Sequence, residues 1–185
     1  MVNKLPDEYE CPFDIILLRF IDTHIEMYSN ISPNTITTIG IIVGILSAYN
    51  ISIKNYRTAS LLFLLAYYFD CVDGKVARKY NKITVFGDYY DHVGDVLKIV
   101  LVLFYLWKSN NEKFKQLSYI LIILLFVVAM HLGCQEELYS KNESDSLFPF
   151  KYLVPTHHHQ LIRYTKFGGC GTLIYFLVLV IYFWE

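Results

Sequence analysis

The stretch "FDCVDGKVARKYNKITVFGDYYDHVGD", residues 69–95, decides the fold of this chain. It carries five aspartates, Asp70, Asp73, Asp88, Asp91 and Asp95, and long apolar segments flank it on both sides. One aspartate near the centre of a membrane helix costs about 2.5–3.5 kcal/mol, and several together also repel one another. We therefore expect this cluster to bind cations or to face water.

The composition indicates a membrane protein. Of 185 residues, 55% are hydrophobic and 18% are charged, whereas roughly 25% of the residues in soluble domains are charged. The 16 Tyr and 13 Phe residues are typical of chains with rings at membrane surfaces. The net charge of −1 gives no indication of nucleic-acid binding. We predict an all-α integral membrane protein whose residues 1–185 form a single domain.

The helical segments can be placed by hydrophobic periodicity. Residues 12–28 have one apolar and one charged face, which predicts an amphipathic helix lying on the membrane surface or packed on the protein itself. Apolar spans follow from about 35, 57, 86, 114 and 168, each near the roughly 20 residues that a membrane-crossing helix needs. We expect five to six transmembrane helices. Gly40 and Gly44 in the first span have a spacing that lets another helix approach closely.

The distribution of Lys and Arg predicts the orientation. With a cytosolic N-terminus, most of these residues fall in cytosolic segments and fewer in the opposite loops. The cytosolic set is Lys4, Arg19, Lys75, Arg78, Lys79, Lys82, Lys141, Lys151, Arg163 and Lys166, and the opposite set is Lys54, Arg57, Lys108, Lys113 and Lys115. This topology of a multi-pass protein places the acidic stretch at the cytosolic membrane face.

Helical spacing brings the carboxylates together. Asp70 and Asp73 share one helix face, and Asp88, Asp91 and Asp95 share a face of the next helix. The linker "KYNKIT" is short, so the two acidic faces can meet. Clustered carboxylates without cysteine ligands favour Mg²⁺ or Mn²⁺, and divalent ions between two helices indicate a phosphate substrate. The alternative is a polar surface loop whose carboxylates are simply solvated.

Two glycines and an arginine strengthen the phosphate interpretation. Gly74 and Gly87 lie inside predicted helices, where each costs about 1 kcal/mol relative to Ala. Glycine at such positions permits close approach by a backbone or a ligand. Arg78 lies one turn beyond Gly74 and is a natural partner for a phosphate.

Written as spacings, the stretch reads D-x2-D-G-x2-A-R-x8-G-x3-D-x3-D, from Asp70 to Asp95. This resembles the CDP-alcohol phosphotransferase family, also called the CDP-alcohol phosphatidyltransferase family, and every position of the motif matches. The segment "PNTIT" is similar to the N-x-x-T entry of that family, with Asn34 and Thr37. The resemblance covers the first three spans, and beyond residue 110 only general hydrophobicity remains.

The resemblance implies a reaction and roles for the site residues. Such enzymes cleave the diphosphate of a CDP-linked donor, release CMP and join the remaining phosphoryl group to an alcohol. Asp70, Asp73 and Asp91 would hold two Mg²⁺ or Mn²⁺ ions. Asp95 would contribute to the metal site and take the proton of the attacking hydroxyl. The CDP portion would be held by Asn34, Thr37, Gly74, Arg78, Thr84 and Gly87. Asp88 is outside the motif.

The same resemblance implies an arrangement of the chain and its partners. Residues 35–110 would form the catalytic helices, and residues 111–185 the remaining spans. The partners would be a CDP-linked lipid or alcohol donor, an alcohol acceptor, membrane lipids and a second copy of the chain in a homodimer.

The donor has two alternatives. "GKVARK" and His92 favour CDP-choline or CDP-ethanolamine with diacylglycerol as acceptor, whereas the short length favours CDP-diacylglycerol, which we prefer. The rival of another class is a non-enzymatic divalent-cation carrier or an inactive relative that binds nucleotide. Neither alternative identifies the acceptor alcohol.

Histidines outside the motif leave their roles open. His131 lies inside the fourth span, where it would face the acceptor pocket or bond to a neighbouring helix. Three adjacent histidines, residues 157–159, lie in the polar loop over 136–167. They cannot all point at one ion, so phosphate or lipid headgroup contact is their best functional interpretation.

Overall fold

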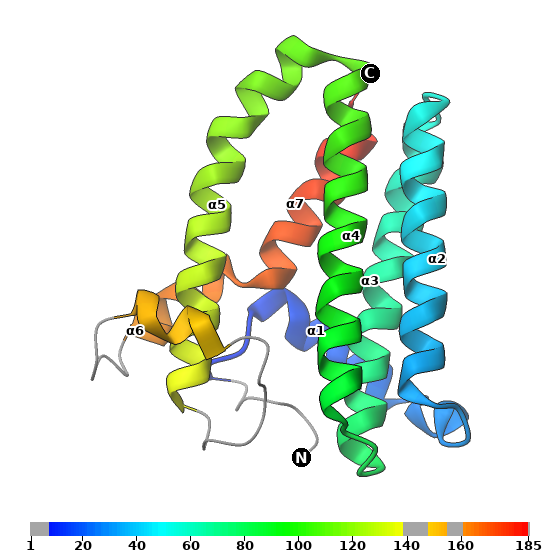
Figure 1. Cartoon of the computed structure of the whole chain (residues 1–185), viewed down its shortest axis with the longest axis vertical. Helices are drawn as coiled ribbons and strands as arrows, with labels where there is room; N and C mark the ends of the chain where they lie inside the picture. The colour runs from blue at the N-terminus through cyan, green and yellow to red at the C-terminus, as the bar shows by residue number, and fades with distance from the viewer. Residues whose placement is uncertain (1–7, 139–147, 155–160, 185) are drawn as a thin grey trace.

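A computed structural model of the protein describes residues 8–138, 148–154 and 161–184. All regular structure within these ranges is helical, which confirms the all-α prediction. The long helices are α2 (Pro33–Ser52), α3 (Tyr56–Lys79), α4 (Val85–Ser109), α5 (Asn111–Leu138) and α7 (Cys170–Tyr182). Figure 1 shows them running along the length of the molecule, with the C-terminus at the end opposite the α3–α4 turn.

The short helices lie in the half of the molecule that contains the α3–α4 turn, with α6 on the side of α5 (Figure 1). They are α1 (Pro12–Asp22), η1 (Ile25–Tyr28), η2 (Phe148–Leu153), α6 (Leu161–Thr165) and η3 (Lys166–Gly168). The prediction of one helix over 12–28 is wrong, because the chain turns at Thr23 and His24 and continues as a 3₁₀ helix. The prediction of a plain loop over 136–167 is also wrong, since it contains η2 and α6. Residues 157–159 lie outside the described ranges.

Local signals explain where the helices around the acidic stretch begin and end. The Ser32 hydroxyl accepts a hydrogen bond from Thr35 N–H (3.2 Å), with Pro33 in the first helical turn of α2. The Thr84 hydroxyl accepts one from Gly87 N–H (3.0 Å) and caps α4 in the same way. Between α3 and α4, Asn81 adopts a left-handed conformation (φ 53°), which reverses the chain. The chain therefore runs in opposite directions along α3 and α4.

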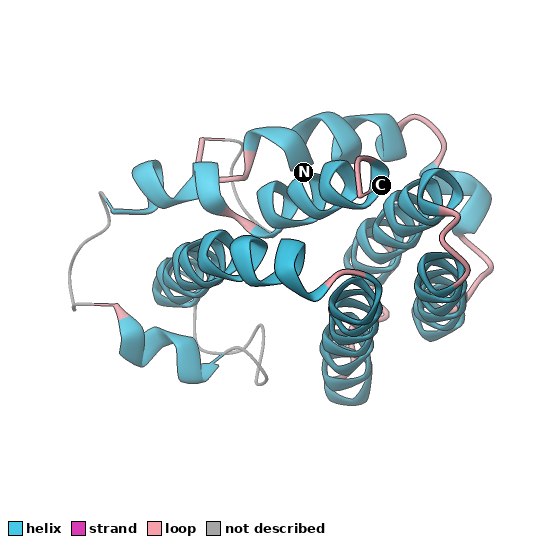
Figure 2. Cartoon of the chain, turned by 90° about the horizontal axis from the view of Figure 1, so that it is seen from above, coloured by secondary structure: helices cyan, strands magenta, loops and turns pink. Residues whose placement is uncertain are grey.

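Two apolar clusters hold the helices together. The larger one joins α2, α3, α4, α5 and α7 through buried residues such as Ile51, Phe63, Leu106 and Leu177. Seen from above in Figure 2, α5 lies apart from α2 and α3, and α2 packs against α3 and α4. For helices that lie in a bilayer, close packing of these apolar side chains, rather than their removal from water, favours the assembly.

The second cluster attaches the N-terminal helix to the bundle. Ile21 and Ile25 of α1 and η1 pack on Ile36, Val72 and Val76 of α2 and α3. The apolar face of this segment therefore packs on the protein itself, one of the two alternatives for residues 12–28. Its outer side still exposes large apolar residues, which include Phe13, Ile16 and Phe20. The packing places α1 against the acidic half of α3.

Within the ranges that the structure describes, three helical segments are long and apolar enough to cross a membrane, judged by length and composition: Pro33–Ser52, Asn111–Gln135 and Leu161–Tyr182. This is fewer than the five to six predicted. The other two long helices, α3 and α4, carry the aspartates together with Lys75, Arg78 and Lys98, and these charged side chains lower their mean hydropathy. Both helices nevertheless expose large apolar side chains in their uncharged parts, such as Leu61 and Val100.

Candidate functional site

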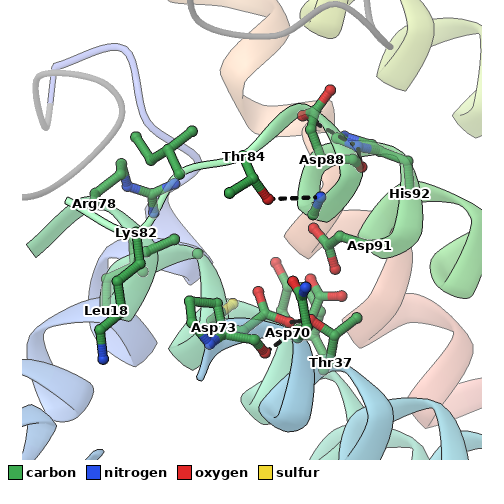
Figure 3. Close-up of a pocket in the computed structure, with 18 of the residues that line it drawn as sticks. Leu18, Thr37, Asp70, Asp73, Arg78, Lys82, Thr84, Asp88, Asp91 and His92 are labelled. Atoms are coloured by element: carbon green, nitrogen blue, oxygen red, sulfur yellow. Dashed lines mark hydrogen bonds and ion pairs between the residues drawn. The ribbon is translucent and has the colours of Figure 1, made fainter. Parts of the chain in front are cut away.

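A cavity of about 440 Å³ lies between α1, α2, α3, α4 and the end of α5. Figure 3 shows its wall, with the aspartates of α3 and α4 converging across it. Nine of the ten residues that the sequence analysis assigned to the site line it: Asn34, Thr37, Asp70, Asp73, Gly74, Arg78, Thr84, Gly87 and Asp91. The tenth, Asp95, lies one helical turn beyond Asp91 and is outside the cavity lining among the described residues.

Three of the carboxylates form a group that could hold a metal ion. One oxygen each from Asp70, Asp91 and Asp95 lies within 4.8 Å of the other two. Within the described part of the chain, the buried Oδ1 of Asp91 has no hydrogen-bond partner. A buried carboxylate oxygen without a partner costs free energy that a cation would recover. The residues thus fit the divalent ion, and a set of oxygen donors suits Mg²⁺ or Mn²⁺.

Asp73 is held differently from the other three. Its Oδ2 accepts a hydrogen bond from the Thr37 hydroxyl of α2 at 2.6 Å, and both side chains are buried. The Thr37 hydroxyl also contacts the Pro33 carbonyl at 3.1 Å. Asp73 lies on the same cavity wall as Asp70, but outside the three-oxygen group. Thr37 therefore binds Asp73 directly. The motif alone did not predict this hydrogen bond.

A lysine reaches into the acidic group. The Lys98 ammonium lies 3.0 Å from Oδ1 of Asp70 and 2.6 Å from Oδ1 of Asp95. Its side chain is 7% exposed, so these ion pairs are largely shielded from solvent. The Asp95 side chain is held between this ammonium and Asp70, with 36% of its surface exposed.

The opposite side of the cavity offers positive charge and small residues. Arg78 and Lys82 line this side of the cavity. The Arg78 side chain lies against Gly74, since a Cβ added at Gly74 would be 3.2 Å from Nη1 of Arg78. The Lys82 ammonium donates to the backbone carbonyls of Ser29 (2.8 Å) and Ile31 (3.3 Å). A guanidinium beside a glycine is suited to a phosphate that approaches the backbone closely.

The first turn of α4 forms the rim of the cavity next to Arg78 and Lys82. Gly87 faces Asn34 and Thr84, since an added Cβ would lie 3.1 Å from Asn34 Oδ1 and 2.9 Å from Thr84 Oγ1. The Thr84 hydroxyl accepts from the α4 backbone, so it positions this turn. In the next turn of α4, the ring Nδ1–H of His92 donates to the carbonyl of Asp88, four residues before it, at 2.7 Å. Both Asp88 and His92 line the cavity.

The far wall joins three segments that are distant in sequence. The carboxylate of Asp14 on α1 accepts a hydrogen bond from the Tyr67 hydroxyl of α3 at 2.5 Å and one from the Gly171 backbone of α7. Burial raises the pKa of the Asp14 carboxyl, and these hydrogen bonds lower it again in part. Asp14 thereby occupies the N-terminal end of α7, where a helix favours negative charge.

His131 bonds to a neighbouring helix, one of its two predicted alternatives. The Thr165 hydroxyl donates to the Leu161 carbonyl at 3.2 Å, so His131 Nδ1–H donates to Thr165 Oγ at 3.1 Å. The other ring nitrogen then accepts from the Gln135 amide at 2.9 Å. Gln135 lines the cavity, whereas His131 is behind it. This chain of bonds engages the amide nitrogen of Gln135.

Three further residues of the site, Lys98, Asp14 and Gln135, were not predicted from the sequence. Lys98 could have been recognised from the sequence, because it is a charged residue in the apolar part of the third predicted span. Ionisable groups at such positions are usually functional. Asp14 and Gln135 had no such signal, since their partners lie far away in the sequence and only the packing of α1, α5 and α7 brings them to the cavity.

Comparison with known proteins agrees with the motif. The profile of the family described as CDP-alcohol phosphatidyltransferase matches residues 30–184. The chain is 42% identical over 82 residues to the CDP-diacylglycerol–glycerol-3-phosphate 3-phosphatidyltransferase of Rickettsia felis, covering 43% of this chain and 45% of the relative. It is 31% identical over 74 residues to the archaetidylinositol phosphate synthase of Pyrococcus horikoshii, covering 40% and 39%.

The matched segments thus span less than half the length of these relatives. No solved structure matches the chain.

Proposed function

Because this chain belongs to the CDP-alcohol phosphatidyltransferase family, we propose that it transfers a phosphatidyl group from a CDP-linked lipid to an alcohol and releases CMP. The reaction would serve phospholipid biosynthesis. The observation that carries the proposal is the group of Asp70, Asp91 and Asp95 around the unpartnered Asp91 oxygen. Two of these acids, Asp70 and Asp91, line one cavity together with Arg78 and Gly74.

We assign the cation site to Asp70, Asp91 and Asp95, with Asp73 on the same wall. Two divalent ions bound there would neutralise the diphosphate and stabilise the departing CMP. Arg78 would contact a phosphate of the donor, and the glycines at 74 and 87 would let the nucleotide approach the backbone. Asn34, Thr37 and Thr84 would position the CDP portion from the rim.

The protein's part in the chemistry is to align and deprotonate the acceptor. The hydroxyl oxygen of the alcohol forms a bond to the phosphorus of the lipid phosphate, and the bond from that phosphorus to CMP breaks. CMP leaves with the bridging oxygen, and the hydroxyl proton goes to Asp95. A carboxylate one helical turn from a metal ligand is at a suitable distance for such general base catalysis.

The relatives favour CDP-diacylglycerol as the donor. The name of the Rickettsia felis enzyme specifies that donor together with glycerol 3-phosphate. The alternative is CDP-choline or CDP-ethanolamine with diacylglycerol as the acceptor. His92 on the cavity wall is the residue that the sequence analysis associated with this alternative.

We further propose that α3 and α4 cross the membrane beside the three apolar segments, which gives five spans. Each has more than the roughly 20 residues required, and their outward side chains, such as Leu61, Leu65, Val96 and Val100, are apolar and exposed. The cavity would then open at the cytosolic face, with the lipid tails in hydrocarbon and the nucleotide in water. A homodimer remains a prediction.

The proposal is tested by CMP release from the purified full chain with Mg²⁺ or Mn²⁺, CDP-diacylglycerol and a panel of alcohols. We expect CMP release that requires both the metal and an acceptor. Asp91→Asn should abolish it while the variant still inserts into membranes, because the amide removes one anionic metal ligand. Glu112→Gln, at an exposed acid of α5, is the matched control and should retain full turnover.

Normal turnover by Asp91→Asn would refute the assigned roles. Replacing CDP-diacylglycerol by CDP-choline plus diacylglycerol separates the two donors. The non-enzymatic rival predicts a different result, metal flux into liposomes without any CMP release. A carrier needs a path to the opposite membrane face, whereas the carboxylates here are all in the halves of α3 and α4 nearer the turn that joins them.

A further inference from the structure

Lys98 makes close contacts with two of the three carboxylates in the proposed cation site. Its ammonium contacts Asp70 of α3 and Asp95 of its own helix, and the side chain is almost fully buried. A buried ammonium needs such partners, because removal from water is costly for an unpaired charge. Lys98 thus supplies positive charge to the oxygens that a divalent ion would also use.

The stem of Lys98 is seated by a glycine. A Cβ on Gly44 of α2 would lie 2.5 Å from Cγ and 2.8 Å from Cδ of Lys98, so any larger residue at position 44 would push the stem aside. The Gly40–Gly44 pair in α2 therefore has two uses. Gly40 faces Phe69 and Ala66 of α3, and Gly44 receives the lysine from α4. This packing directs the ammonium toward the carboxylates.

We propose that Lys98 is an internal cation that competes with the divalent metal for Asp70 and Asp95, so that the site takes up metal together with its anionic donor. This inference rests on the proposed function for the identity of that donor. The competition itself follows from the contacts of Lys98 with Asp70 and Asp95. A divalent ion on the Asp70, Asp91 and Asp95 oxygens would lie close to an ammonium that already contacts two of them, and like charges at this distance in a shielded site repel strongly.

The repulsion couples metal and donor. Without a diphosphate, the ammonium offsets one carboxylate charge and weakens metal binding. A bound diphosphate adds negative charge on the other side of the ion, which favours the metal again. Since coupling free energies are reciprocal, metal should strengthen binding of the nucleotide by the same factor.

The experiment is a Mn²⁺ titration of the detergent-solubilised full chain, with free Mn²⁺ followed by electron paramagnetic resonance. CDP serves as a soluble diphosphate probe and is added in a parallel titration. Lys98→Met keeps an unbranched stem for the Gly44 seat and removes the charge. Lys98→Gln also removes the charge but retains hydrogen-bond donors for Asp70 and Asp95, which guards against misfolding. Lys108→Met, at an exposed lysine of the same helix, is the matched control.

Both Lys98 variants should bind Mn²⁺ without CDP at least about tenfold more tightly than the wild type, because a repelling charge is gone. Adding CDP should then strengthen Mn²⁺ binding in the wild type and in Lys108→Met more than in either Lys98 variant. Unchanged or weaker Mn²⁺ binding by a folded Lys98→Gln protein would overturn the inference.

This titration is independent of turnover. Tighter Mn²⁺ binding in the Lys98 variants together with no CMP release in any assay would leave the lysine inference standing and refute the transferase proposal. CMP release by the wild type with equal Mn²⁺ affinity in all variants would support the transferase proposal and refute the lysine inference.

Discussion

Thr37 shows how a single hydroxyl on α2 supports the acidic site on α3. Its donor bond to Asp73 is short (2.6 Å) and buried, and a hydrogen bond to a charged group contributes about 1.5–3 kcal/mol. Thr37 thereby fixes the orientation of Asp73 on the cavity wall that it shares with Asp70.

Thr37→Val should therefore destabilise the protein by about 1.5–3 kcal/mol, because Asp73 would stay buried without its hydroxyl donor. The measurement is the thermal unfolding of the detergent-solubilised chain. Thr38→Val is the matched control, since the same substitution one residue on removes an exposed hydroxyl that contacts the Asn34 carbonyl and Tyr90. Equal unfolding temperatures for the two variants would contradict the role given to Thr37.

At the scale of whole elements, Lys75 ties the N-terminal helix α1 to α3. Its side chain is fully buried, and its ammonium donates to the Leu18 carbonyl at 2.8 Å and pairs with Asp22. Leu18 and Asp22 are in the last turns of α1, toward its C-terminal end. A lysine is well placed there because the C-terminal end of a helix favours positive charge.

We expect Lys75→Met to loosen α1 from the bundle. The buried Leu18 carbonyl would lose its donor, at a cost of about 1–3 kcal/mol, so amide hydrogen exchange in residues 12–22 should become faster. Lys79→Met, one turn further along α3, removes a more exposed pair with Glu26 (3.5 Å). Exposed pairs contribute about 0–1 kcal/mol, so this control should leave the exchange in α1 unchanged. If both variants exchange alike, Lys75 is not what holds α1.

For the molecule as a whole, the two ends of the bundle differ in character. One half contains the short helices and the turn between α3 and α4, and the opposite end carries the α2–α3 and α4–α5 turns and the C-terminus (Figure 1). The cavity is lined by residues of the α3–α4 turn, such as Ile83 and Thr84. A membrane-spanning protein with this arrangement would expose Ile83 and Asn110 on opposite sides. Both residues are exposed in the structure.

Cysteine labelling in sealed membrane vesicles of known orientation tests this topology. A membrane-impermeant maleimide should label Ile83→Cys from the cytosolic side and Asn110→Cys from the other side, because the reagent cannot cross hydrocarbon. The parent chain, which has four free cysteines including the exposed Cys170, supplies the background. Labelling of both positions from one side would refute a membrane-spanning α4, and the reversed pattern would refute the cytosolic placement of the cavity.

The helical class, the approximate positions of the long helices and the shared faces of the aspartates could be predicted from the sequence. Helix geometry repeats every 3.6 residues, so the spacing from Asp70 to Asp73 and from Asp91 to Asp95 already placed each pair on one face. A short linker then left the two faces few ways to avoid each other. Local regularity of this kind needs no knowledge of the remaining chain.

The tertiary structure alone decided which side chains complete and divide that site. Lys98 reaches the acids because Gly44 on another helix leaves room for its stem, and Asp14 reaches the cavity because α7 offers it a free helix end. Thr37 and Asp73 are 36 residues apart. Such contacts depend on the way whole helices pack, which is settled by the shapes of many side chains together and leaves no periodic trace in the sequence.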